Sequence, residues 1–291
     1  MRVLVGCSGW AYSDWVGAFY PPELGGRQHE WLSYYSKFFS TAEVNSTFYA
    51  IPPKRLVEGW IERVSAIDFE FSLKLPSDIT HTLLPTGKEE EIDAVLNRFK
   101  ENCIQPIARA GRLGEVLIQL SPAVRYPEHL NNVMVLLEKT SAMAKCAIEF
   151  RHHSWVEGRE VRGDVLDILE LTGTTSVMVD SPAFPATSAI TSGRGYVRFH
   201  GRNRDIWYTG TVEGDRRINR YDYLYSRREL AEWLPKIKDI IASTSETRIY
   251  FNNHGRAKGA RNALELMDML SIPHASKKIS ISDQTKLLGF A

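Results

Sequence analysis

The sequence is poor in cysteine and has no long apolar run, and each absence excludes a class of protein. The three cysteines, Cys7, Cys103 and Cys146, are odd in number and never stand in a C-x-x-C spacing. This argues against a disulfide framework and against a cysteine zinc site. Such usage is typical of a reducing compartment, so we expect a cytoplasmic protein. No stretch approaches the roughly 18 consecutive apolar residues of a membrane-spanning helix.

Charge of one sign is also missing. The formal net charge is +1, so the chain has no global field that would recruit nucleic acid or an anionic membrane. The run Val3–Cys7 near the start is too short for the apolar part of a secretion signal and has no cleavage motif. We therefore expect no membrane partner, and we expect any basic site to be local.

The composition and the length of the chain are those of a globular protein. Hydrophobic residues make up 43% and charged residues 24% of the 291 positions, which is ordinary for a globular protein. The length is large for an average domain but falls within the range of one α/β barrel. We expect residues 1–291 to form a single domain.

Short β-rich runs alternate with helical periodicity along the whole chain. Apolar spacing predicts helices around 92–99, 130–137 and 230–237, and less cleanly around 32–39, 57–64, 165–169 and 263–270. Ser226 with Glu229, and Thr86 with Glu89, have capping-box spacing. The connection 181–195 shows no helical pattern. Eight strands are predicted: Val3–Cys7, Ala42–Asn45, Phe69–Lys74, Val116–Leu120, Ala147–Phe150, Ser176–Val179, Tyr196–His200 and Arg248–Asn252.

Strands that alternate with helices indicate a parallel sheet. The first predicted strand is not followed by the Gly-x-Gly-x-x-Gly pattern of dinucleotide-binding folds. An open doubly wound sheet is one arrangement, but eight units of this spacing favour closure into a TIM (β/α)8 barrel with a helix-poor connection between strands 6 and 7.

Alternation within the strands predicts which side chains point into the barrel. Apolar residues on one face suit the helices outside, so the other, polar face should line the axis. Most of this inward set ends its strand, where barrels build active sites. An internal salt-bridge network is the competing interpretation, and Glu70 belongs to it. The inward set comprises Glu43, Asn45, Lys74, Gln119, Glu149, Arg151, Asp180, Arg198, His200 and Asn252.

Three stretches carry the chemistry. In 147–155, Arg151 shares a face with Glu149, so it could keep the carboxylate ionised or clamp an anion. In 196–204, His200 is the best acid/base candidate by residue type, although a neighbouring carboxylate could hold it neutral. In 251–262, a helix start predicts an anion site built from Gly255, Gly259, Arg256, Lys258 and Arg261; a merely solvated helix start is the alternative. Asn253 and His254 of the same stretch are candidate substrate-binding residues.

Aromatic residues gather in the first two connections after strands, including Trp10 and Tyr49. They could wall a pocket or stack against a sugar ring or a base. Packing of long loops onto the barrel rim explains them equally well.

Six motifs in order resemble those of one family. They are Gly6-Cys7-Ser8-Gly9-Trp10, Glu43-Val44-Asn45-Ser46-Thr47-Phe48-Tyr49, Phe71-Ser72-Leu73-Lys74-Leu75-Pro76, Glu149-Phe150-Arg151-His152, Tyr196-Val197-Arg198-Phe199-His200-Gly201 and Tyr250-Phe251-Asn252-Asn253-His254. Together they resemble the YecE-like proteins, the family of domain of unknown function 72, from residue 3 to about 270. The resemblance implies a TIM barrel and no established activity. Such proteins have been loosely related to sugar isomerases and compared with metal-dependent barrel endonucleases.

Three hypotheses follow. The first is an isomerase-like or hydrolase-like enzyme that acts by acid/base chemistry on a small anionic, sugar-phosphate-like substrate without a cofactor; Glu149 or His200 would move protons while Lys74, Arg151 and Arg198 hold the anion. The second is a metal-dependent phosphodiesterase or nuclease with a divalent ion on Glu43, Glu149, Asp180 and His200. The third, which is the least favoured, is a binding module for nucleic acid or a phosphorylated ligand. It would use Arg202, Arg204, Arg216, Arg217 and Arg220 with Trp207, Tyr208 and Tyr221.

Overall fold

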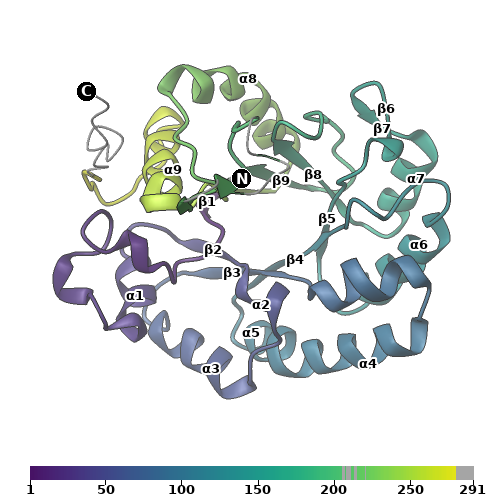
Figure 1. Ribbon diagram of the computed structural model, residues 1–291, viewed down its shortest axis with the longest axis horizontal. Coiled ribbons are helices and arrows are strands. Elements are labelled where there is room, and N and C mark those ends of the chain that lie inside the picture. Colours follow the sequence, from purple (N-terminus) through teal and green to yellow (C-terminus); the bar gives the residue numbers. More distant parts are fainter. Residues whose placement is uncertain (205–206, 208–210, 213–214, 220, 280–291) are drawn as a thin grey trace.

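Eight parallel strands close into a barrel in the computed structural model of the chain (Figure 1). The structure describes residues 1–204, 207, 211–212, 215–219 and 221–279, with the backbone alone for 211–212 and 215–219. The neighbours around the barrel are β1-β12-β9-β8-β5-β4-β3-β2, and β1 pairs with β2 to complete the ring. The barrel strands are β1 Arg2–Cys7, β2 Thr41–Val44, β3 Glu70–Lys74, β4 Leu113–Gln119, β5 Cys146–Glu149, β8 Thr175–Asp180, β9 Arg194–Phe199 and β12 Glu246–Phe251.

These strands confirm all eight predicted ones, with ends that move by up to three residues. The largest shift is at β4, which begins at Leu113 rather than at Val116. Closure of the ring confirms the TIM barrel, and the open doubly wound alternative is wrong. The extent of a single domain over 1–291 stays a prediction, because residues 280–291 lie outside the described part of the chain.

Helices surround the ring of strands (Figure 1). They are α1 Gln28–Tyr35, α2 Ser46–Tyr49, α3 Lys54–Arg63, α4 Glu89–Phe99, α5 Gln105–Arg109, α6 Leu130–Ser141, α7 Gly163–Leu171, α8 Arg227–Ser243 and α9 Lys258–Met269. Short helical turns are η1 Ser13–Trp15, η2 Pro22–Leu24, η3 Asp78–Leu83, η4 Leu84–Thr86, η5 Lys100–Ile104, η6 His153–Trp155 and η7 Gly255–Ala257. Two hairpins extend from the barrel: β6 Val156–Glu157 with β7 Glu160–Val161, and β10 Thr211–Val212 with β11 Asp215–Asn219. No described helix combines the length and the apolar character needed to cross a membrane.

One of the two predicted capping boxes forms. The Ser226 hydroxyl accepts the backbone N–H of Glu229, and the Glu229 carboxylate accepts that of Ser226, so α8 begins as predicted. The box at Thr86 is wrong, since that hydroxyl donates to the Leu83 carbonyl at 2.9 Å and α4 begins at Glu89 without a side-chain cap.

The connection between β8 and β9 contains no helix, as predicted for 181–195. Thr191 ties it to the barrel: its hydroxyl donates to the Thr174 carbonyl at 2.6 Å and accepts the Ser176 N–H at 2.9 Å. Nearer the middle of the connection, Lys236 of α8 donates from Nζ to the Ala186 carbonyl at 3.0 Å. The connection is therefore hydrogen bonded to the barrel wall, at the start of β8, and to α8.

A layer of buried charges fills the amino end of the barrel. Arg248 of β12 is 1% exposed and binds Glu70 at 2.6 Å and Glu115 at 3.0 Å. The guanidinium supplies both carboxylates with hydrogen bonds, which offsets the cost of removing the charges from water. The interpretation of Glu70 as part of an internal salt-bridge network is therefore confirmed. This layer fills the barrel axis at the amino end of the strands.

Candidate active site at the carboxyl end of the barrel

Strand register decides which polar side chains meet at the carboxyl end. Glu149 of β5 pairs with Gln119 of β4, and Arg198 of β9 pairs with Val179 of β8. Residues opposite one another in parallel strands point to the same face, so polar positions on separate strands converge on the axis. Contacts join most of the predicted set: Glu43, Asn45, Gln119, Glu149, Arg151, Arg198, His200 and Asn252.

Arg198 is the centre of this cluster. Its guanidinium binds Glu43 through Nη2 at 2.6 Å and Glu149 through Nη1, and all three side chains are fully buried. Tyr196, two residues earlier on the same strand, donates its hydroxyl to the second oxygen of Glu43 at 2.7 Å. Burial alone raises the pKa of Glu149, but the charges of Arg151 and Arg198 outweigh it and hold that pKa well below its usual range. Glu149 is therefore an ionised counter-ion rather than a proton donor.

His200 lies between an amide and this carboxylate. Its Nδ1 accepts from Asn252 Nδ2 at 3.0 Å, and its Nε2 lies 3.2 Å from Glu149 Oε1. Burial and then the neighbouring arginines lower the pKa of His200 to about 3, although Glu149 opposes them. The ring is therefore neutral at physiological pH, but burial and the arginines keep it so, whereas the neighbouring carboxylate, which was expected to do this, favours the charged form. Asn45 fixes the amide in turn, because its Nδ2 donates to Asn252 Oδ1 at 3.1 Å.

Lys74 ends β3 beside this cluster and differs from the other charged members. The side chain is nearly buried, with 8% of the residue exposed, and Nζ lies 3.9 Å from the centre of the Phe48 ring. Among the described residues, no carboxylate lies within ion-pair distance of Nζ. Burial, then Arg198 and Arg151, lower the pKa of Lys74 to about 7. This amine therefore changes protonation state near neutral pH.

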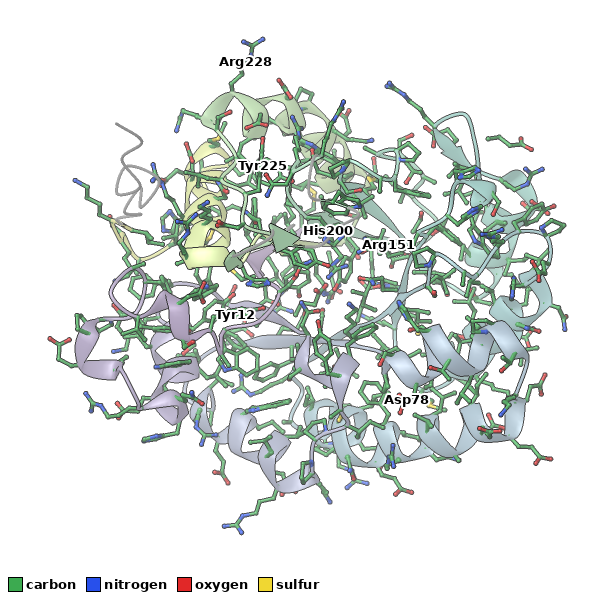
Figure 2. The ribbon with its side chains drawn as sticks, in the orientation of Figure 1. Tyr12, Asp78, Arg151, His200, Tyr225 and Arg228 are labelled. Carbon is green, nitrogen blue, oxygen red and sulfur yellow. The ribbon has the colours of Figure 1, made fainter. Side chains whose placement is uncertain are left out.

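Arg151 forms the accessible edge of the cluster. It binds Glu149 through Nε and donates from Nη2 to Gln119 at 2.9 Å, and its side chain is 14% exposed. Figure 2 shows Arg151 and His200 close together near the middle of the ring of strands. Arg198 is fully buried between two carboxylates, so within this cluster Arg151 and Lys74 are the cations that an incoming anion could reach.

Asp180 does not belong to the cluster, and its predicted inward orientation is wrong. Val179 pairs with Arg198 and takes the inner face, which turns Asp180 toward α8. Its carboxylate accepts from the indole of Trp233 and from the hydroxyl of Tyr225 and pairs with Arg202 at 2.6 Å. Asp180 pairs with Phe199 of β9 and shares its outer face, so its acidic character gave the wrong orientation.

The predicted anion site at the start of α9 is occupied by the protein itself. Asp222 pairs with Arg256 at 2.6 Å and with Lys258 at 2.8 Å. A Cβ added to Gly255 would lie 2.8 Å from the Asp222 carboxylate, so only glycine allows this approach. The helix start is thus neither open to an anion nor merely solvated.

Three further predicted residues lie outside the cluster. Asn253 is fully buried and donates to the Tyr223 carbonyl at 2.8 Å, and the His254 ring stacks on Tyr12 at 4.4 Å. Trp10 packs edge-on against Trp60 of α3 at 5.6 Å. Each of these three holds a loop or a helix on the barrel. Their predicted role in substrate binding stays a prediction.

Tyr49 lies at the rim, 81% exposed and 5.3 Å from the Phe48 ring that covers Lys74. Phe48 itself, together with Tyr196 and His81, was missed as a site residue. The position of Tyr196 in the same alternation as Arg198 was a usable signal. His81 had none, because it lies in η3, beyond β3, where no strand period applies; Lys74 and Arg151, after burial, help lower its pKa to about 4.

The residues proposed as metal ligands do not assemble, whereas the nucleic-acid prediction depends partly on residues outside the described part of the chain and stays a prediction. Arg198 fills the space between Glu43 and Glu149, and Asp180 faces away, so the predicted ligand set is not brought together. Within the described ranges, no three His, Cys, Asp or Glu side chains are grouped as a metal site requires. Arg202 is paired with Asp180 and Glu232. Tyr208, Arg220 and the side chains of Arg216 and Arg217 lie outside the described part.

The chain matches known proteins over nearly its whole length. Residues 4–285 match the family described as protein of unknown function DUF72. The UPF0759 protein YunF of Bacillus subtilis is 26% identical over 283 residues, which cover 94% of this chain and 96% of YunF. The UPF0759 protein YecE of Escherichia coli K12 is 24% identical over 230 residues, covering 70% and 78%.

Solved structures agree. A DUF72 protein of Thermotoga maritima is 31% identical, with a TM-score of 0.78 over 93% of this chain and all of that one. A second from Enterococcus faecalis is 23% identical, with a TM-score of 0.76 over 96% of this chain and all of that one. A D-psicose 3-epimerase, 10% identical with a TM-score of 0.52 over 94% of this chain and all of that one, shares the barrel fold alone. With the match over nearly its whole length, this chain belongs to the DUF72 family.

Proposed function

We propose that the protein is an enzyme that moves protons on a small anionic, sugar-phosphate-like substrate at the carboxyl end of the barrel. One observation carries this proposal: Lys74 is nearly buried, lies beside two arginines and has no carboxylate within ion-pair distance among the described residues. A pKa of about 7 suits a group that must both accept and donate a proton at neutral pH.

The neighbouring groups act as a fixed electrostatic frame. Glu149 stays ionised and His200 stays neutral, so neither is the mobile proton carrier in this proposal. Arg151, partly exposed at the rim, would bind the anionic group, and the amides of Gln119 and Asn45 would orient hydroxyls. This division of roles replaces the hypothesis that Glu149 or His200 moves protons.

The partner in this proposal is a small molecule rather than nucleic acid. Arg151 and Lys74 lie in the cluster at the barrel mouth, and Arg202, which the nucleic-acid hypothesis uses, is ion-paired with Asp180 and Glu232. We keep the cytoplasm as the proposed location, because the three cysteines are free and buried.

Hydrogen exchange at carbon tests the proposal without knowledge of the product. A panel of phosphorylated ketoses and aldoses is incubated in D2O with the protein, and loss of the proton next to the carbonyl is followed by NMR. We expect exchange on at least one compound with the unaltered protein and none with Lys74→Met. Lys54→Met is the matched control, because Lys54 is an exposed lysine at the start of α3. Equal exchange with both variants would remove the assigned role of Lys74, and absence of exchange and of thermal stabilisation across the panel would remove the function.

A further inference from the structure

We propose that Lys74 condenses with the carbonyl carbon of its substrate to form an imine, so that the substrate is a small aldehyde or ketone that carries an anionic group. This inference rests on the proposed function and adds to it a covalent step and a substrate class. It is drawn from the surroundings of one nitrogen atom.

An amine attacks a carbonyl only in its neutral form, and ion pairing with a carboxylate prevents that form. Other lysines of the described chain are paired in this way: Lys139 with Asp93 at 2.6 Å and Lys258 with Asp222 at 2.8 Å. Lys74 instead faces the positive charges of Arg151 and Arg198 in a nearly buried position. Desolvation next to other cations is the arrangement that activates a lysine as a nucleophile.

The charge balance of the cluster specifies the second part of the substrate. Lys74, Arg151 and Arg198 face two carboxylates, Glu43 and Glu149, which together already bind Arg198 and Arg151. Counted over the described side chains of this cluster, a protonated Lys74 therefore leaves one positive charge in excess. An anionic group on the substrate, held at the exposed edge of Arg151, would balance that charge and bring the carbonyl group to Nζ. Because only 8% of Lys74 is exposed, a compact substrate fits this position best.

The step needs no reactant beyond the two partners. The neutral amine attacks the carbonyl carbon; a C–N bond forms as the π electron pair of the carbonyl moves to oxygen. Both amine protons then pass to that oxygen, which leaves as water when the C–N double bond forms. Uptake of one proton from solvent gives the iminium ion, which draws electrons from the adjacent carbon and eases removal of its proton. No oxidation or reduction occurs.

Borohydride trapping tests the inference on the full chain. The protein is incubated at pH 7 with dihydroxyacetone phosphate and sodium borohydride, which reduces an imine to a stable secondary amine, and the adduct is located by peptide mapping. We expect labelling of Lys74 at least about tenfold above that of any other lysine, because a lysine of ordinary pKa is almost wholly protonated at this pH. Internal references are exposed Lys54 and half-buried Lys236, which lies outside the barrel. Dihydroxyacetone without phosphate should label Lys74 about tenfold less, the loss of one modest anion contact.

The outcomes separate this inference from the proposed function. Lys74→Arg keeps the charge but cannot form the imine, so it should bind dihydroxyacetone phosphate, seen as thermal stabilisation, and show no adduct at position 74. Thermal stabilisation of the unaltered protein without labelling of Lys74 would overturn the imine and leave the acid/base function standing. If neither is seen with dihydroxyacetone phosphate or with any compound of the phosphorylated sugar panel, both proposals are overturned. Should Lys74→Arg fail to fold, the peptide map of the unaltered chain decides alone.

Discussion

The ammonium nitrogen of Lys74 lies over the face of Phe48, 3.9 Å from the ring centre. Burial and the two arginines favour the neutral form of the amine, whereas the negative face of the ring and the charges of Glu43 and Glu149 favour the charged form. The protonation state of Lys74 therefore depends on the balance between these effects, and the ring is the one contact of the set that can be removed without changing a charge.

Phe48→Leu should lower the pKa of Lys74 further, by about half a unit, because a cation–π contact contributes roughly 0.5–1 kcal/mol. The pKa is measured from the pH dependence of acetylation of Lys74, mapped by peptide mass. Tyr34→Leu is the control. It removes a ring of α1 whose centre lies 5.1 Å from Lys277 Nζ, away from the barrel mouth. An unchanged or higher pKa of Lys74 in Phe48→Leu would mean that the ring does not stabilise the ammonium.

His200 predicts a loss of stability in mild acid. Its pKa in the folded protein is about 3, below the roughly 6.5 of an unfolded chain, so the unfolded state binds more protons between these values and stability falls as pH decreases through this window. Between pH 6.5 and 4.5 this one group should cost about 2–3 kcal/mol. The measurement is chemical denaturation at both pH values, in which His200→Asn should lose correspondingly less stability between them. His29→Asn on the surface is the control, and an equal loss in both variants contradicts the prediction.

Arg198→Met should destabilise the protein by about 3–5 kcal/mol, because it leaves two buried carboxylates without their shared cation. The free energy of unfolding is measured by urea denaturation near pH 7. Adding Glu43→Gln to Arg198→Met should restore part of the loss, since one uncompensated charge is then removed. If Arg198→Met costs less than about 1 kcal/mol, Glu43 and Glu149 do not depend on Arg198 for compensation of their charge.

Asp222→Asn should open the anion site that the protein now fills with its own carboxylate. Arg256 and Lys258 would keep their positions near the start of α9 but lose the charge that neutralises them. We expect sulfate to stabilise this variant at concentrations about tenfold lower than the unaltered protein requires, as measured by thermal unfolding against sulfate concentration. Glu265→Gln, which removes a carboxylate from the same helix, should show no such change. A response equal to that of the unaltered protein would mean that the two cations find other partners.

Much of the site followed from short-range pattern. The period of two in each strand placed Glu43, Glu149 and Arg198 on the inner face, because a pleated strand turns alternate side chains the same way whatever surrounds it. Asp180 breaks the pattern for a tertiary reason: β8 presents Val177 and Val179 to the barrel axis, so its acidic end faces α8. No local rule reports the phase in which a strand enters a barrel.

The sequence by itself determined the eight-stranded barrel, the end at which its charges gather and the helix-free connection before β9. Those properties depend on apolar periodicity and strand length, which are local. Only the tertiary structure decided which charges are satisfied: Arg198 is enclosed by two carboxylates, Asp222 neutralises the start of α9, and Lys74 has no such partner among the described residues. The pKa of a group depends on burial and on charges brought from distant parts of the chain. For that reason the candidate proton carrier moved from His200 to Lys74 only when the strands were in place.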